Sequence, residues 1–430
     1  MMTDLKFIYK KYKESGKVST DTRSITPGAV FFALRGEKFN GNELANEALD
    51  KGACCAVVDE EAWAKDGRYL LVQDSLQTLQ QLARHHRDQL NIPVVALTGS
   101  NGKTTTKELI HAVLGQRYRV LATAGNLNNH IGVPLTLLAI DHTIEIAVIE
   151  MGANHAGEIA HLCKLANPTH GLITNIGKAH IGTFGGMDNI IKGKSELYEH
   201  LIGHNGTVWI NSQNKILANM AGRFKNPLFY PSQGDFFHCK LLAADPFVCI
   251  STEQDEEIKT HLIGAHNFEN VAAALCVAKF FEVDPRKAAD AIRQYEPANM
   301  RSQIVKKGTN TIILDAYNAN PSSMEAAIAS LAQMPSERKV AILGDMFELG
   351  GEADQEHRML AEWLDAAGIT EVYLCGQLIR SAFHKQPGAR YFETRELLTD
   401  YLKAHPVKNS TILIKASRGM ALEGIIDFLE

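Results

Sequence analysis

The fold is decided by the stretch Val94-Val95-Ala96-Leu97-Thr98-Gly99-Ser100-Asn101-Gly102-Lys103-Thr104-Thr105-Thr106. The apolar run Val94–Leu97 predicts a buried strand, and apolar residues at helical spacing predict a helix over Thr104–Leu114. Between them, glycines let backbone N–H groups turn toward one point, where the helix N-terminus adds positive potential. Lys103 adds a cation there, and the Thr104 hydroxyl can reach Mg²⁺. The junction therefore predicts a phosphate site.

The predicted phosphate loop consists of Gly99, Ser100, Asn101, Gly102, Lys103, Thr104 and Thr105. It departs from the general nucleotide-loop pattern, which has glycine six residues before the lysine, where this chain has Leu97. A glycine turn that only connects a strand to a helix is the alternative interpretation.

The composition is that of a globular protein of several domains. The chain has 430 residues, of which 45% are hydrophobic and 22% charged, and its net charge is −5. These values predict a large core and two to four domains, and they give no reason to expect nucleic acid or an anionic membrane as partner. Any bound anion must therefore be held by local cations.

The cysteines and the N-terminus predict a soluble cytoplasmic protein. Seven cysteines occur without a C-x-x-C pair, which favours buried thiols in a reducing compartment over a zinc site or disulfides. Charged residues interrupt Met1–Lys13, so no signal-peptide core is expected, and no apolar run is long enough to span a membrane.

Strand-like and helix-like segments alternate along most of the chain, which predicts α/β domains with mostly parallel sheets. The polar stretch that ends at Pro93 and the segment Pro297–Met300 suggest two boundaries. We expect an N-terminal domain over 1–88, a central domain over 89–297 and a C-terminal, Rossmann-like domain over 298–430. Residues 211–257 have weak periodicity and are predicted to be rich in strands.

Polar residues follow three predicted strands of the central domain. The phosphate loop follows the first, Glu150 ends the second, and a glycine-rich loop after the third carries His180. In a parallel sheet such strand ends meet at one edge, and Glu150 and Thr104 are suitable oxygen ligands for Mg²⁺. The alternatives are a helix cap or surface position for Glu150 and a core or loop position for His180.

Several of these stretches resemble, in order, the motifs of the Mur ligases, which are ATP-dependent amino-acid ligases of peptidoglycan synthesis. The shortened glycine loop is the form that this family uses. The resemblance spans essentially the whole chain and rests on Asp21–Gly36, Thr98–Thr105, Glu150–His155, Asn175–His180, Gly264–Asn270, Leu314–Met324, Gly344–Gly350 and Lys415–Met420.

The resemblance implies a particular reaction. Leu314–Met324 and Gly344–Gly350 are similar to members that add D-alanyl-D-alanine to a UDP-N-acetylmuramoyl-tripeptide with ATP, through an acyl phosphate. It also implies two Mg²⁺ ions and domains that close around the substrates. Other ligases of the superfamily, such as the one that adds the third residue or a folylpolyglutamate synthase, are alternatives, as is an inactive nucleotide-binding protein. Diaminopimelate and lysine both stay open as the third stem residue, and a monomer is the default.

The resemblance also assigns roles to individual residues. Lys103 would bridge the β and γ phosphates, while Thr104, Glu150, His180 and Lys194 would hold metal. Lys194 matches the lysine that the family carbamylates; Lys192 is close by, and a solvated surface lysine is the alternative for either. Nucleotide contacts are implied for Asn267, Asn270, Arg301 and Asp315, and substrate contacts for Thr22, Arg23, Ser24, Asn128, Asn129, Asn318 and Asn320. An asparagine-rich turn is the alternative for Asn128 and Asn129.

Overall fold

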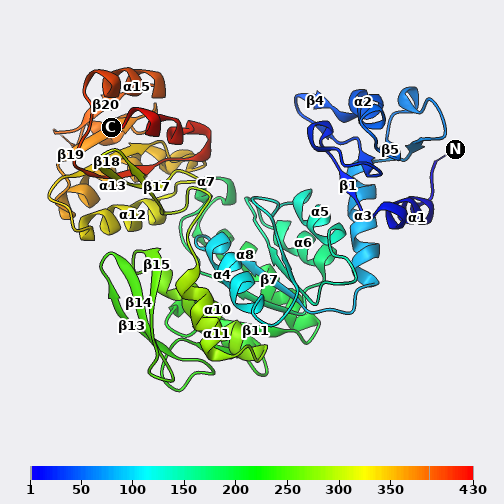
Figure 1. Ribbon diagram of the computed structural model, residues 1–430, viewed down its shortest axis with the longest axis horizontal. Helices are drawn as coiled ribbons and strands as arrows, with labels where there is room; N and C mark the ends of the chain where they lie inside the picture. The colour runs from blue at the N-terminus through cyan, green and yellow to red at the C-terminus, as the bar shows by residue number, and fades with distance from the viewer. Residues whose placement is uncertain (1, 387, 430) are drawn as a thin grey trace.

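Three α/β units follow one another along the chain in the computed structural model, which describes residues 2–386 and 388–429 (Figure 1). The N-terminal and C-terminal units lie at opposite ends of the view, and the central unit joins them. The predicted class, three α/β domains with parallel sheets, is confirmed. The exact boundaries at 88/89 and 297/298 stay predictions.

The N-terminal unit has a four-stranded parallel sheet in the order β1-β2-β5-β6. Its two central strands are buried along their whole length, as expected where helices cover both faces. The helices and strands are α1 Leu5–Ser15, β1 Val18–Ser19, β2 Val30–Phe32, β3 Arg35–Gly36, β4 Phe39–Asn40, α2 Ala45–Asp50, β5 Cys55–Val58, β6 Tyr69–Leu71 and α3 Ser75–Asp88.

The central unit is built on a six-stranded parallel sheet in the order β12-β11-β10-β7-β9-β8. Its elements are β7 Val94–Thr98, α4 Lys103–Leu114, β8 Val120–Ala122, α5 Gly132–Leu138, β9 Ile146–Glu150, α6 Glu158–Ala166, β10 His170–Ile173, α7 Ile181–Phe184, α8 Met187–Gly203, β11 Thr207–Asn211, α9 Lys215–Met220 and β12 Leu228–Tyr230.

Strand β7 lies at the middle of this sheet and packs into two different cores. Val94 and Ala96 belong to the core on the side of α5, α6 and α8, whereas Val95 and Leu97 belong to the core on the side of α4 and α10. The predicted strand is therefore buried on both faces. Because β9 and β10 flank β7, the loops after all three strands meet at one edge of the sheet.

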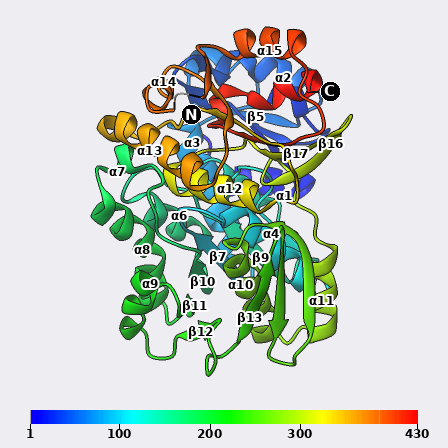
Figure 2. The same ribbon diagram turned by 90° about the vertical axis from the view of Figure 1, so that its left-hand side faces the viewer.

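The segment with weak periodicity is rich in strands, as predicted. It leads into a three-stranded antiparallel sheet in the order β13-β14-β15, beside two helices. The rotated view in Figure 2 shows that this sheet lies next to α10 and α11. The bounds are β13 Cys239–Ala244, β14 Phe247–Thr252, β15 Glu257–Ile263, α10 Asn267–Phe280 and α11 Pro285–Gln294.

The C-terminal unit has a second six-stranded sheet, in the order β16-β17-β21-β18-β19-β20. All its strands are parallel except β16, which pairs antiparallel with β17 and was not predicted. Its elements are β16 Gln303–Lys307, β17 Asn310–Asp315, α12 Pro321–Gln333, β18 Lys339–Gly344, α13 Ala353–Ala366, β19 Glu371–Cys375, α14 Arg380–Phe383, β20 Arg390–Phe392, α15 Arg395–Ala404 and β21 Thr411–Lys415. None of the helices in the described ranges is long and apolar enough to cross a membrane.

Candidate functional site

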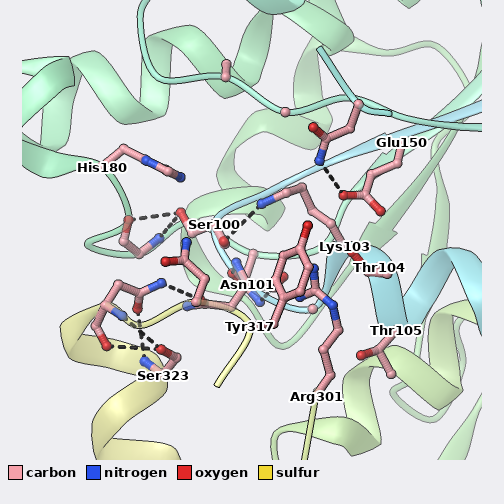
Figure 3. A pocket seen from close by; sticks show the side chains of 18 of the residues that line it. Ser100, Asn101, Lys103, Thr104, Thr105, Glu150, His180, Arg301, Tyr317 and Ser323 are labelled. Carbon is pink, nitrogen blue, oxygen red and sulfur yellow. Dashed lines mark hydrogen bonds between the residues drawn. The ribbon is translucent and has the colours of Figure 1, made fainter. Parts of the chain in front are cut away.

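A cavity of about 960 Å³ lies where the strand ends of the central sheet face the C-terminal unit. The predicted phosphate loop lines one wall, and residues that follow β17 line the opposite wall. Figure 3 shows both walls, with Lys103 and Glu150 on one side and Arg301 and Tyr317 on the other. The structure thus brings together residues that lie more than 200 positions apart in the sequence.

The phosphate loop has a positive φ, which favours glycine, at two positions. Gly99 has φ +150° and Gly102 has φ +75°. A Cβ on Gly99 would lie 2.0 Å from Thr174 Oγ1, and one on Gly102 would lie 2.4 Å from Asn270 Oδ1. The Asn101 N–H also donates to Asn175 Oδ1 at 2.9 Å. The loop is therefore fixed against its neighbours, which a simple connecting turn would not require.

Lys103 lies inside this loop. Its Nζ donates to the carbonyl oxygens of Gly99 at 2.8 Å and Ser100 at 3.1 Å. Burial lowers the pKa of Lys103 to about 8, against the opposing effect of Glu150. The side chain is thus a cation at neutral pH, held at the position where the loop would meet phosphate oxygens.

Glu150 ends β9 and is 1% exposed, so the surface and helix-cap interpretations are wrong. Its Oε1 accepts a hydrogen bond from Asn128 Nδ2 at 2.7 Å, and its backbone N–H donates to Thr123 Oγ1 at 3.0 Å. Its Oε2 is buried without a hydrogen-bond partner. A buried carboxylate oxygen without a donor is costly unless a cation binds it.

Glu150 and the buried Thr104 hydroxyl therefore fit a Mg²⁺ ion, because both supply the oxygen ligands that this ion prefers. Within residues 2–386 and 388–429, three or more His, Cys, Asp or Glu side chains do not come together in a metal-binding cluster. Any metal held here must accordingly take most of its oxygens from substrate, water or a modified side chain.

Lys194 is fully buried on α8, whereas Lys192 is exposed. The surface-lysine interpretation is therefore wrong for Lys194 and correct for Lys192. Lys194 Nζ donates to Ala153 O at 3.2 Å and lies 5.2 Å from the ring centroid of Phe184. Burial, with a further contribution from Lys103, lowers the pKa of Lys194 to about 7. Lys194 does not itself line the cavity, although Ala153 does.

His180 follows β10 and lines the cavity, as Figure 3 shows. Its backbone is left-handed, with φ +58°. Its Nδ1 forms a hydrogen bond with Glu348 Oε2 from the C-terminal unit. His180 is therefore neither a core residue nor a free loop residue.

The four residues predicted to contact nucleotide all line the cavity. Asn270 Nδ2 donates to Asn267 Oδ1 at 2.8 Å, and Asp315 Oδ2 accepts from Lys415 Nζ at 2.6 Å. Arg301 stacks on Tyr317, with its guanidinium carbon 3.9 Å from the ring centroid, and its Nε is buried without a partner. The wall thus offers a flat cation and polar groups.

Four asparagines predicted to contact substrate also line the cavity. Asn128 holds Glu150, and Asn320 Nδ2 donates to Asn101 Oδ1 across the domain junction at 2.8 Å. Asn318 Oδ1 accepts from the next backbone N–H. Asn129 Oδ1 caps a turn by accepting from two backbone N–H groups, so the turn interpretation does describe this side chain.

Thr22, Arg23 and Ser24 do not line the cavity. They form a short helical turn of the N-terminal unit, in which Arg23 Nη2 lies 2.6 Å from Asp21 Oδ2. Lys51 Nζ donates to the carbonyl oxygen of Thr22. These three residues therefore lie outside the cavity.

Sequence reasoning missed several residues of the site. Asn175, Tyr317 and Lys415 lie within the motifs that carried the resemblance, so a signal for them existed. Gln80, His130 and His161 line the end of the cavity nearest to α3; His130 directly follows the predicted Asn129, whereas Gln80 and His161 belong to no motif. Their positions depend on how α3, α5 and α6 pack together.

Fold and site together define a nucleotide-binding α/β enzyme of three domains. Family models match nearly the whole chain: "Mur ligase family, catalytic domain" over residues 16–87, "Mur ligase middle domain" over 97–278, and "Mur ligase, glutamate ligase domain" over 300–418. The chain belongs to the Mur ligase family.

Relatives within the family are similar over most of their length. The UDP-N-acetylmuramoyl-tripeptide–D-alanyl-D-alanine ligase of Bacillus subtilis (strain 168) is 35% identical, covering 96% of this chain and 93% of its own. The ligase of the same name from Escherichia coli (strain K12) is 36% identical, with the same coverage. A MurF structure from Acinetobacter baumannii covers 96% of this chain and 93% of its own, at 31% identity and a TM-score of 0.84. The structure of MurF ligase from Thermotoga maritima in complex with ADP covers 96% of this chain and 96% of its own, at 28% identity and a TM-score of 0.83.

Proposed function

We propose that this protein joins D-alanyl-D-alanine to a UDP-N-acetylmuramoyl-tripeptide with the hydrolysis of ATP to ADP and phosphate. The observation that carries the proposal is that Lys103 and Glu150, whose Oε2 is buried without a hydrogen-bond partner, line the same cavity. Relatives of that activity are similar over the full chain. A monomer is the default state of this proposed enzyme.

Nucleotide would lie between the central and C-terminal domains. Lys103 would meet the β and γ phosphates, and Asn267 and Asn270 would meet the base. Arg301 and Asp315 would approach the phosphate and ribose from the opposite wall. The ADP-bound relative from T. maritima supports a nucleotide in this fold.

Mg²⁺ would bind through Glu150 and Thr104, and a second ion through His180 and a carbamate on Lys194. Bound Mg²⁺ would neutralise charge on the phosphoryl oxygens. A pKa of about 7 leaves much of Lys194 as the neutral amine, which is the form that reacts with CO₂. The carbamate would convert a buried cation into an anionic oxygen ligand beside Lys103.

Two steps would complete the reaction. A carboxylate oxygen of the tripeptide attacks the γ-phosphorus of ATP in line, the bond to the ADP oxygen breaks, and an acyl phosphate forms. Lys103 offsets charge on the transferred group. The neutral amine of D-alanyl-D-alanine then attacks the acyl carbon, loses a proton, and displaces phosphate.

The UDP part of the substrate would bind the N-terminal domain at Thr22, Arg23 and Ser24, with the domains divided at 1–88, 89–297 and 298–430. Asn128, Asn129, Asn318 and Asn320 would contact its peptide end or the incoming dipeptide. Since the two sets of residues lie apart, we propose that the domains close around the substrates and exclude water. Scattering that shows no compaction with an ATP analogue and UDP-substrate would contradict closure.

An acceptor-dependent assay tests the function. Phosphate release is measured with ATP and a UDP-tripeptide ending in either diaminopimelate or lysine, and with D-alanyl-D-alanine, glutamate, lysine or diaminopimelate as acceptor. Release only with D-alanyl-D-alanine is expected. Release only with a single amino acid would indicate another ligase of the family, and nucleotide binding without turnover would indicate an inactive nucleotide-binding protein.

Lys103→Ala supplies the site-directed arm of this assay. We expect ligation to fall by at least about 100-fold, because the phosphoryl group loses a preorganised cation. Lys192→Ala is the matched control, since Lys192 is an exposed lysine near the same site, and it should keep its activity.

A further inference from the structure

The stretch Gly344–Gly350, which carried part of the family resemblance, has no role in the proposed chemistry. It follows β18, and its backbone is held by side chains from elsewhere in the C-terminal domain. The Met346 N–H donates to His357 Nε2 at 3.0 Å, and the Phe347 N–H donates to Ser417 Oγ at 2.9 Å. Residues 346 and 347 are therefore rigidly held and support the residue that follows them.

That residue is Glu348, whose backbone is left-handed with φ +63°. Such a conformation is strained for a residue other than glycine, so the surrounding contacts must fix it. The Gly182 N–H donates to the carbonyl oxygen of Glu348 at 3.1 Å. A Cβ on Gly182 would lie 2.5 Å from the backbone nitrogen of Gly350. The two backbones thus meet closely, across the junction between domains.

This backbone contact places the Glu348 carboxylate on the imidazole of His180. The carboxylate oxygen Oε2 pairs with Nδ1. Within the described part of the chain, no hydrogen bond occupies the other ring nitrogen, Nε2, and His180 lines the cavity beside Lys103. Figure 3 shows the imidazole pointing into the cavity from its loop.

An imidazole whose Nδ1–H donates to a carboxylate presents the lone pair of Nε2. Histidines that bind metal usually have such a carboxylate partner, which fixes the tautomer and orientation of the ring and raises its basicity. His180, whose Nδ1 pairs with the rigidly held Glu348, has the same arrangement as such a metal-binding histidine.

We propose that Glu348 is a positioning residue for His180: the C-terminal domain supplies the carboxylate that orients the imidazole toward the second metal ion. This proposal rests on the proposed function, because that function gives His180 its metal. The His180 metal position is complete only while the C-terminal domain is docked on residues 177–186, so docking and metal binding stabilise each other.

A second ion pair joins the same two segments and separates this role from simple domain attachment. Lys178 Nζ lies 2.5 Å from Glu356 Oε1. The Lys178 side chain is 50% exposed, so water can hydrate it once Glu356 is changed, and glutamine keeps a polar group at the 4% exposed Glu356 position; the pair does not involve the His180 ring. Glu356→Gln is thus a matched control for Glu348→Ala.

The experiment uses the full chain, Mn²⁺ as the probe, and a non-hydrolysable ATP analogue. Electron paramagnetic resonance measures free Mn²⁺ in a titration, and its echo modulation detects an imidazole nitrogen bound to the ion. Wild type should show the nitrogen signal, and His180→Gln should lose it. Glu348→Ala should lose the signal as well, with affinity for that ion lowered about 10- to 100-fold. Glu356→Gln should keep the nitrogen signal and the Mn²⁺ affinity within twofold of wild type.

Gly182→Ala provides a second variant that leaves Glu348 and His180 in place. The added methyl group would push the two backbones apart, and the nitrogen signal should weaken. Circular dichroism checks that each variant is folded. A Glu348→Ala protein with unchanged affinity and signal would overturn the proposal, and tighter Mn²⁺ binding would show that Glu348 competes with the metal. A wild type that ligates but lacks the nitrogen signal would overturn it while leaving the proposed function intact.

Discussion

The N-terminal domain meets the central domain through buried side chains, whereas the C-terminal domain meets it through ion pairs in which one partner of each pair is about half exposed. At the first junction, the Tyr12 hydroxyl donates to Leu138 O at 2.8 Å, and His86 Nε2 bonds to Ile140 O at 2.8 Å. Arg87 is 5% exposed and reaches across the same junction. Helix α3 packs on α5 and α6 there.

At the second junction, both ion pairs come from one loop of the central domain, and Asn320 adds a hydrogen bond to Asn101. Lys178 pairs with Glu356, and His180 pairs with Glu348, whose side chain is 42% exposed. Exposed ion pairs contribute little to stability, while loss of a partner for a buried polar group is costly. Ligands can therefore reposition the C-terminal domain at a smaller energetic cost than the N-terminal domain, whose junction is the more rigid of the two.

The largest effect should come from Arg87→Ala. Its guanidinium donates to the carbonyl oxygens of Ala166 at 2.9 Å, Leu90 at 2.8 Å and Asn167 at 3.1 Å. Removing it leaves buried acceptors without donors, so the free energy of unfolding should fall by about 3 kcal/mol in urea titrations. Arg84→Ala, one turn earlier and exposed, should cost less than about 1 kcal/mol. Equal effects of the two changes would mean that burial does not distinguish this junction.

Tyr12→Phe should have a smaller effect at the same junction. It deletes only the hydroxyl that donates to Leu138 O and lies 3.2 Å from His86 Nε2. We expect a loss of about 1 kcal/mol in the same urea titration. Tyr9→Phe is the control, because Tyr9 makes one weaker contact at 3.3 Å. A larger loss for Tyr9→Phe would contradict the assignment.

Mild acid should weaken the N-terminal junction through His86. Burial lowers the pKa of His86, with Lys13 and His85 adding to the shift and the hydrogen bond to Ile140 opposing it. Below its unfolded pKa of about 6.5, the unfolded chain binds a proton that the folded chain does not, so stability falls as pH falls. Between pH 7 and pH 6 this loss is at most about 0.7 kcal/mol. His86→Gln should show a flatter dependence, and an unchanged slope would refute the interpretation.

The smallest effect should come from the second junction. Glu356→Gln removes the charge of a side chain that is 4% exposed but keeps a polar group of similar shape there, and Lys178 stays 50% exposed, so the free energy of unfolding should change by less than about 0.5 kcal/mol. The urea midpoint measures it. A loss as large as that of Arg87→Ala would show that both junctions are fixed alike.

Much of the fold could be predicted from local patterns. β7 and α4 follow from apolar periodicity around Val94–Thr106, and Glu150 falls into the site because the ends of neighbouring parallel strands meet. Short or half-exposed strands such as β16 Gln303–Lys307 were missed, since their burial alternates too weakly.

Some residues of the candidate site could also be predicted from local sequence, and others could not. Gly99, Lys103 and Thr104 could be assigned a role because the chemistry of the loop is local. The partners of His180 and Glu150 could not, because Glu348 lies 168 residues from His180 and Asn128 approaches Glu150 only after α5 has packed. Position in the sequence also cannot show that Lys194 is buried and Lys192 exposed.

An oxygen-isotope experiment tests most directly whether this cavity phosphorylates a carboxylate before ligation. The tripeptide is labelled with ¹⁸O in its terminal carboxylate, and the phosphate released with D-alanyl-D-alanine is analysed by mass spectrometry. An acyl phosphate predicts one carboxylate oxygen in each phosphate formed per peptide bond. Phosphate whose extra oxygen comes only from water would contradict the account, because ATP would then have been hydrolysed without activating the substrate.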